Sequence, residues 1–138
     1  MIKKRVGNKM IYEIKSPILG FENIEKMELE DIDETFAKLQ DVKNQNISFT
    51  LVNPFVLRDY DIEVPKNYQE LLEIDEKSRV AVYCVMILQN PIQNSTINFL
   101  APVIFNQDKK LMGQIILDSS KYPNYSIAEQ ISNYLSKS

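Results

Sequence analysis

The chain has 138 residues, of which 44% are apolar and 25% are charged, and its net charge is −3. This length suits one domain over residues 1–138, whose core needs no disulfide or metal for support. The chain has no histidine, only one cysteine (Cys84) and three well-separated glycines. These counts exclude histidine-dependent catalysis, an internal disulfide and a glycine-rich phosphate loop.

The compartment follows from three further observations. No apolar run approaches the roughly 20 residues that a membrane helix needs. Lys9, Glu13 and Lys15 interrupt the segment that follows the basic N-terminus, so no signal peptide is expected. A single cysteine suits a reducing environment. We therefore expect a cytoplasmic protein that associates with no membrane and holds no cofactor.

The first half of the chain predicts short strands separated by turns. The clearest is 47–52, where apolar residues alternate with Ser48 and Thr50, as in a half-buried strand. Pro54 ends this strand, because proline cannot donate to a ladder. Residues 68–74 predict one or two helical turns. Weaker strand candidates are 9–14, 26–32, 36–40 (which fits a helix equally well) and 60–64.

The second half contains the strongest apolar run, 80–88, with the sequence VAVYCVMIL. It is too short to cross a membrane and is rich in β-branched residues, which predicts a strand buried on both faces. Residues 96–105 and 111–117 are two more extended runs, and 106–110 suits the hairpin turn between them. The pattern S-x-x-E at 126–129 resembles a capping box and predicts a short C-terminal helix. Its inward side chains would be Ile127, Ile131, Tyr134 and Leu135.

Five to eight short strands with one or two minor helices predict a mainly β fold, a small antiparallel sheet curled into a barrel or sandwich. Two residues should interrupt this sheet. Asn98 carries an amide that must find partners if it is buried, and we expect it to fix a strand crossing or bulge. Pro102 should break the ladder near an edge or bend.

Three groups of side chains could carry chemistry. Asp59, Asp61 and Glu63 would share one face of a strand and could bind a hard cation, but a solvated acidic face is the simpler interpretation. Cys84 lies in an apolar strand with no histidine to activate it, which favours a core residue. The tyrosines could stack on bases. No basic face accompanies them, so we expect no direct nucleic-acid binding, although a small nucleic-acid-binding barrel remains the alternative.

The charge is spread unevenly. Between Glu22 and Glu76 there are 15 acidic and 5 basic residues, against 4 acidic and 11 basic residues elsewhere. This stretch is either a solvated acidic face or a surface that attracts a basic partner and repels nucleic acid. Together with the absence of catalytic motifs, it favours a protein that binds other proteins over an enzyme.

Three blocks of sequence resemble the flagellar assembly factor FliW family. They are ILGFE at 18–22, FTLVNPF at 49–55 with the Asp-Tyr pair at 59–60, and TINFLAPVIFN at 96–106 with GQIIL at 113–117. The three blocks occur in the same order as in the family. In the third block, a phenylalanine replaces the commoner leucine after the asparagine. The residues that carry the motifs are Asn53, Pro54, Phe55, Asn98, Ala101, Pro102 and Asn106.

The resemblance implies a barrel-like fold in the bacterial cytoplasm and two mutually exclusive partners. One is flagellin, bound near its C-terminal helical region before export. The other is CsrA, the RNA-binding translational repressor of flagellin, which the free protein would antagonise. The oligomeric state stays open. Candidate flagellin contacts, which could instead be buried under the protein's own chain, are Tyr83, Val85 and Ile87. Candidate CsrA contacts are Glu28, Glu30, Asp31, Asp59 and Asp61.

Overall fold

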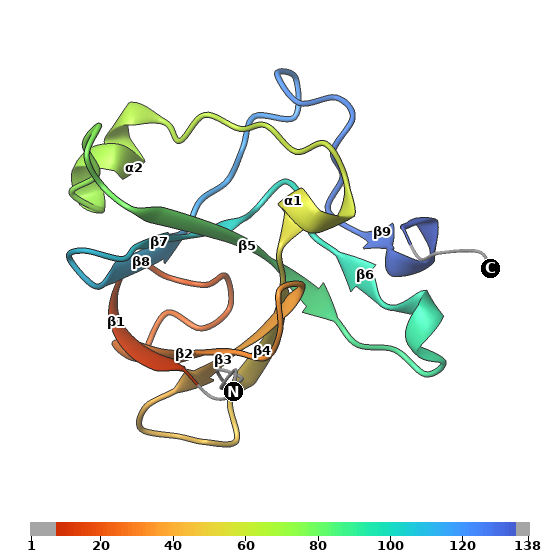
Figure 1. Cartoon of the computed structure of the whole chain (residues 1–138), viewed down its shortest axis with the longest axis horizontal. Coiled ribbons are helices and arrows are strands. Elements are labelled where there is room, and N and C mark those ends of the chain that lie inside the picture. The colour runs from red at the N-terminus through yellow and green to blue at the C-terminus, as the bar shows by residue number, and fades with distance from the viewer. Residues whose placement is uncertain (1–7, 135–138) are drawn as a thin grey trace, which may run out of the picture.

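A computed structural model describes residues 8–134 and shows a curled sheet with short helices around it (Figure 1). The strands are β1 (Lys9–Ser16), β2 (Lys26–Asp31), β3 (Phe36–Asp41), β4 (Ser48–Val52), β5 (Val80–Ile87), β6 (Thr96–Ile97), β7 (Val103–Asn106), β8 (Leu111–Gln114) and β9 (Glu129–Gln130). The helical elements are α1 (Pro54–Leu57), α2 (Lys66–Leu71) and the 3₁₀ turns η1 (Ile92–Asn94) and η2 (Ile131–Asn133). The predicted mainly β, barrel-like fold with short helices is confirmed.

Within residues 8–134, seven strands close a ring in the order β1-β2-β3-β4-β5-β7-β8, and β8 pairs back with β1. The β1–β8 pairing is parallel, so the sheet is mixed and not wholly antiparallel. Gly113 permits this closure, because a Cβ at Gly113 would lie only 2.7 Å from the Cβ of Ser16. The short strands β6 and β9 extend the sheet from the end of β5, outside the ring (Figure 1).

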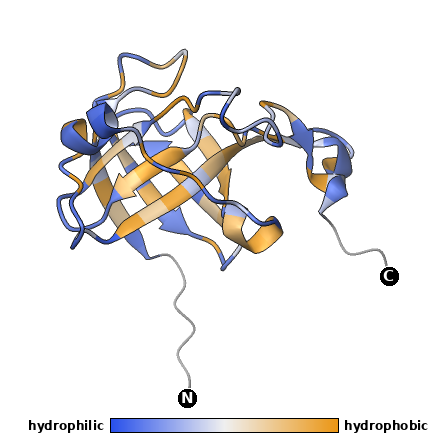
Figure 2. Cartoon of the chain, turned by 90° about the horizontal axis from the view of Figure 1, so that it is seen from above, coloured by the Kyte–Doolittle hydropathy of each residue, from blue (hydrophilic) through white to orange (hydrophobic). Residues whose placement is uncertain are grey.

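Alternate residues of the ring strands point inward and fill the barrel, as the two-residue period of a strand requires. Tyr12 contacts the edge of Phe105 at 5.0 Å between ring centroids. The apolar segments lie mostly on the strands, and the connecting loops are mainly hydrophilic (Figure 2). The buried interior consists of Tyr12, Ile18, Met27, Leu29, Ala37, Leu39, Leu51, Val103, Phe105 and Met112.

A second core lies on the outer side of β5, where α1 and the C-terminal segment cover the sheet. Its centre is Tyr60, whose hydroxyl donates to the carbonyl of Phe99 at 2.7 Å. Cys84 is fully buried beside it, as predicted, and burial raises the pKa of the Cys84 thiol to about 12. The thiol therefore stays protonated and unreactive in the folded protein. The other buried members are Val52, Met86, Ile97, Phe99 and Ile131.

Arg58 anchors the C-terminal segment to this second core. Its Nη1 lies 3.2 Å from Oε1 of Glu129, and its guanidinium stacks 4.7 Å from the ring centroid of Tyr125. Glu129 also accepts from the backbone N–H of Ser126 at 3.1 Å, which is half of the expected capping box. The predicted C-terminal helix is present only as the 3₁₀ turn η2, which starts later than expected because Glu129 begins the two-residue β9. Leu135, assigned to that helix, lies outside the described residues.

Other sequence expectations need smaller corrections. Residues 60–64 are extended but pair with no strand, and the run 96–105 is split into β6, a bend and β7. The helical turns expected at 68–74 start earlier, as α2. β5 is not buried along its whole length, because both of its ends are exposed. No helix among residues 8–134 is long and apolar enough to cross a membrane.

Candidate functional site

An apolar groove lies at one end of the barrel, where the connection from β1 to β2 meets β4 and the end of β5. We call it the barrel-end groove. Ile87 and Leu19 are each 59% exposed on it, although both are large apolar residues. Exposed apolar side chains that gather at one place typically mark a site for a partner. The apolar residues of the groove are Ile18, Leu19, Phe21, Phe49, Val85, Met86, Ile87, Leu88 and Ile127.

The turn 18–21 forms one wall of this groove, and the side chain of Gln114 anchors it. Gly20 takes a φ of +87°, a left-handed conformation that glycine adopts without strain. The side-chain carbonyl of Gln114 accepts from the N–H of Leu19 at 2.9 Å, while its amide donates to the carbonyl of Ala101 at 2.9 Å. Gln114 therefore ties the turn to the bend that precedes β7.

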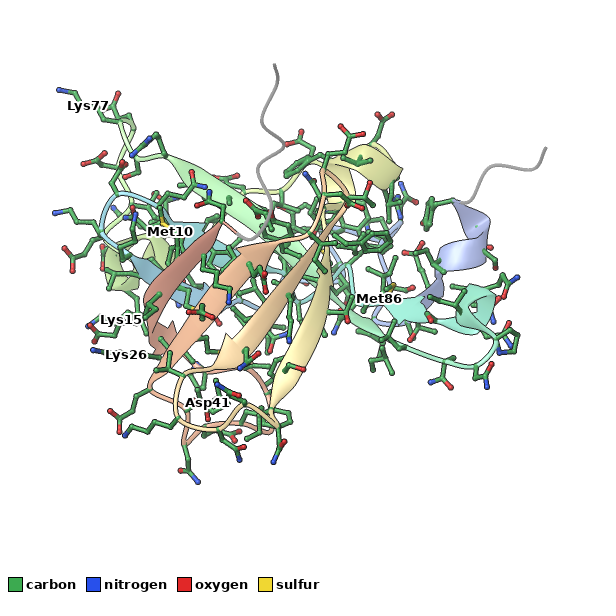
Figure 3. All side chains as sticks on the ribbon, turned by 60° about the horizontal axis from the view of Figure 1, so that its bottom comes forward. Met10, Lys15, Lys26, Asp41, Lys77 and Met86 are labelled. Carbon is green, nitrogen blue, oxygen red and sulfur yellow. The ribbon has the colours of Figure 1, made fainter. Side chains whose placement is uncertain are left out.

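Phe49 of β4 forms the adjoining wall. Its ring meets the edge of Phe21 at 4.9 Å between centroids and 90° between planes, so the turn and β4 share an aromatic contact. Met86, which also lines the groove, points to the flank where β5 meets β6 (Figure 3). The groove thus has rigid walls from three separate parts of the chain.

The three β5 residues suggested as flagellin contacts lie on one face but have different surroundings. Tyr83 is inside the barrel, where its ring meets Phe105 at 5.8 Å and its hydroxyl donates to Asp31 at 3.2 Å. Burial, followed by the negative charge of Asp31, raises the pKa of Tyr83 to about 12. Val85 is half-buried in the barrel-end groove, and Ile87 is exposed there. The structure therefore brings Val85 and Ile87 to the groove, whereas Tyr83 lies outside the groove, half-buried against the barrel core.

The five acidic candidates lie on two separate elements. Glu28, Glu30 and Asp31 belong to β2, and Glu30 faces Lys38 of β3 and Lys9 of β1 across the sheet.

The other two, Asp59 and Asp61, lie on the exposed segment that follows α1. This segment pairs with no strand, and Asp59, Asp61 and Glu63 are all exposed along it, alternating with less exposed residues. Among residues 8–134, no group of three or more candidate ligands could hold a metal ion.

The motif residues of the second block build a turn. The side-chain carbonyl of Asn53 accepts from the N–H of Phe55 at 3.0 Å, which caps α1. Pro54 is buried at the first position of the helix. Phe55 is 52% exposed and contacts the ring of Tyr60 at 5.7 Å. Only Phe55 among these three offers a side chain to a partner.

The motif residues of the third block also have structural roles. The side-chain oxygen of Asn98 accepts from the N–H groups of Leu100 and Ala101, so the amide is satisfied and fixes the bend between β6 and β7. Pro102 is buried just before β7. Asn106 is fully buried, and its amide donates to the carbonyls of Leu72 and Glu73 at 2.9 and 3.1 Å.

Sequence reasoning missed most of the barrel-end groove. Its missed residues come from the turn 18–21, from β4 and from the residues after β5, and only the tertiary fold brings them together. One signal was present, because large apolar residues flank the glycine of the turn on both sides, which is unusual for an exposed turn. The missed residues are Leu19, Phe21, Phe49, Leu88 and Ile127.

Comparison with known proteins gives consistent matches. The family described as "FliW protein" matches residues 2–130. The chain is 47% identical over 126 residues to "Flagellar assembly factor FliW 1" of Wolinella succinogenes, covering 91% of this chain and 98% of that protein. It is 44% identical over 128 residues to "Flagellar assembly factor FliW" of Sulfurimonas denitrificans, covering 93% of this chain and 100% of that protein.

A solved structure agrees with the sequence matches. "Crystal structure of the flagellar assembly factor FliW" superposes with a TM-score of 0.80 and 28% identity, covering 93% of this chain and 88% of that one. Both the fold and the sequence therefore point to one family of assembly factors and not to a family of enzymes. The chain belongs to the FliW family of flagellar assembly factors.

Proposed function

We propose that this protein works in the cytoplasm, as one domain over residues 1–138, and binds the C-terminal helical region of flagellin before export. The barrel-end groove is the observation that carries this proposal. An amphipathic helix binds by placing its apolar face in such a groove. Leu19, Ile87 and Leu88 are each more than half exposed there, so they are available to a partner without unfolding the barrel.

We propose further that the free protein binds CsrA and relieves its repression of flagellin synthesis. The support is the acidic stretch between Glu22 and Glu76, with 15 acidic and 5 basic residues. A negative surface placed beside a basic RNA-binding protein weakens its association with RNA, because it competes electrostatically with the phosphates.

A competition experiment tests the proposed function. The purified protein is titrated with flagellin and, separately, with CsrA by isothermal titration calorimetry. Flagellin is then added to the complex with CsrA. We expect both partners to bind and flagellin to release CsrA. Failure to bind flagellin would contradict the main proposal, and salt-dependent binding of RNA by the isolated protein would favour a nucleic-acid-binding barrel instead.

Reversing the acidic candidates should reduce CsrA antagonism. Because they lie on two elements, the reversals are made as two sets of lysine substitutions, and binding is measured by release of labelled RNA from CsrA. We expect at least one set to weaken antagonism about tenfold at low salt, and less at high salt. A matched control is Glu34→Lys with Glu70→Lys, two exposed residues outside both sets. Full antagonism by both sets would refute the electrostatic mechanism. The two sets are Glu28, Glu30, Asp31 and Asp59, Asp61.

A further inference from the structure

A second groove lies on the outer side of the barrel, between the extended segment 61–64 and the start of β5. We call it the acidic groove. In Figure 1 the chain from α1 to α2 passes over β5 at this place. No residue lines both this groove and the barrel-end groove. Its apolar lining consists of Phe55, Ile62, Val64, Ile74, Val80 and Val82, and its acidic residues are Asp61, Glu63, Asp75 and Glu76.

One backbone edge of the segment 61–64 is already occupied. The N–H of Asp61 donates to the hydroxyl of Tyr125 at 2.9 Å, and the N–H of Glu63 donates to the hydroxyl of Tyr122 at 2.9 Å. The two tyrosine rings stack with 5.6 Å between centroids and 10° between planes. This pair of side chains therefore holds the segment extended in the way that a neighbouring strand would.

The other backbone edge of the segment is only partly occupied, because the carbonyl of Val64 accepts from Nε2 of Gln69 at 2.7 Å. Successive residues of an extended chain point their N–H and C=O groups to opposite sides. The N–H groups of Ile62 and Val64 thus lie opposite the tyrosines, and the part of the chain that the structure describes gives them no hydrogen-bond partner. Both residues line the acidic groove. Free N–H groups on an extended segment beside an apolar groove are donors that an added strand can use.

The carboxylates of the acidic groove outnumber the cations near them, of which Lys66 and Lys121 line a separate pocket together with Glu63. No lysine or arginine is among the described residues that line it. Arg79 pairs with Asp108 at 2.8 Å, and Lys109 lies 3.8 Å from Glu73, so both cations have partners elsewhere. Lys77 extends away from the barrel into solvent (Figure 3). The groove therefore presents net negative charge to an incoming chain.

We propose that the acidic groove binds an extended cationic segment of another protein by strand addition to residues 61–64. In such a segment, apolar side chains alternate with lysine or arginine. The apolar side chains pack on Ile62, Val64 and Val82, while the cations reach Glu63 and Glu76. The period of two in a strand provides this separation of faces. Binding here is independent of the barrel-end groove and does not require it.

The test uses a fluorescein-labelled octapeptide of alternating lysine and valine, with binding to the full chain followed by fluorescence anisotropy. We expect saturable binding, and about tenfold weaker binding to the variant Glu63→Lys/Glu76→Lys. Neither carboxylate makes a side-chain hydrogen bond or ion pair within residues 8–134, so the variant should fold. The matched control Glu34→Lys/Glu70→Lys has the same change of charge outside the groove and should bind nearly as well as the parent.

A second measurement distinguishes strand addition from simple charge attraction. The same peptide with N-methyl groups on alternate amides keeps its charge but loses its backbone donors, and we expect its binding to fall at least about tenfold. Exchange of the Ile62 and Val64 amides should slow in the complex with the unmethylated peptide. The proposal would be overturned if the methylated peptide bound as well as the unmethylated one, or if the control and groove variants bound the peptide equally. It would also be overturned if the protein formed a dimer that Glu63→Lys/Glu76→Lys abolishes. Flagellin binding should not change in any of these variants.

Discussion

Ile87→Lys should weaken flagellin binding by about 30-fold or more while leaving the barrel folded. Ile87 is 59% exposed, so the free protein loses little buried apolar area on substitution. In the complex the same position would lie under an apolar helix face, where a lysine loses the apolar contact and must be desolvated. Calorimetric titration with flagellin measures the affinity, and the thermal unfolding temperature checks that the fold is intact.

Ile32→Lys is the matched control for this variant. Ile32 is 55% exposed and lies in the turn between β2 and β3, outside the barrel-end groove. It should bind flagellin as the parent does. Equal affinities of the two variants, or a strongly lowered unfolding temperature for Ile87→Lys alone, would show that the groove is not the flagellin site. Tyr83→Lys should lower the unfolding temperature instead, because the half-buried Tyr83 packs on Phe105.

Asn106→Ala should lower the free energy of unfolding by about 2–4 kcal/mol, because it removes hydrogen bonds to groups that stay buried. The Asn106 amide donates to the carbonyls of Leu72 and Glu73, and its oxygen accepts from the N–H groups of Asp108 and Lys109. The residue thus joins the end of α2 to the β7–β8 hairpin. Equilibrium unfolding in urea, monitored by circular dichroism, gives the change.

Asn124→Ala provides the comparison for this second variant. Asn124 is exposed in a loop, and its side chain makes no hydrogen bond within residues 8–134. We expect a change within about 0.5 kcal/mol. If Asn106→Ala were equally mild, the amide would not be the link that holds α2 to the hairpin. Flagellin affinity, measured below the unfolding transition, should be unchanged in both variants.

Sequence patterns predicted the elements that depend on nearby residues. The alternation of apolar and polar residues at 47–52 gave β4, and the apolar run at 80–88 gave β5, because side-chain period and β-branching act locally. Asn98 was expected to be a satisfied amide at a strand crossing or bulge; it is satisfied, but by two hydrogen bonds that fix the bend between β6 and β7. On β5, the same local period placed Val85 and Ile87 on the face that forms the groove.

The remaining features depend on contacts between distant residues. The S-x-x-E pattern indicated a helix, but Arg58 pairs with Glu129 from 71 positions away and holds the segment in another conformation. The groove wall at Leu19 depends on a hydrogen bond to Gln114, 95 positions away. A single sequence cannot reveal such pairs, because local propensity is a weak prior that tertiary contacts override.

The closure of the ring between β1 and β8 has a consequence during synthesis of the protein. Ser16 donates to the carbonyl of Gln114, 98 residues further along the chain, so the ring cannot close until nearly all of the chain has left the ribosome. Until then β1 lacks its partner strand, and the turn 18–21 lacks the side chain that anchors it. Contacts of such long separation slow folding and leave strand edges open to aggregation. A nascent or truncated chain therefore has no finished groove, and only a completely synthesised molecule can take up its partner.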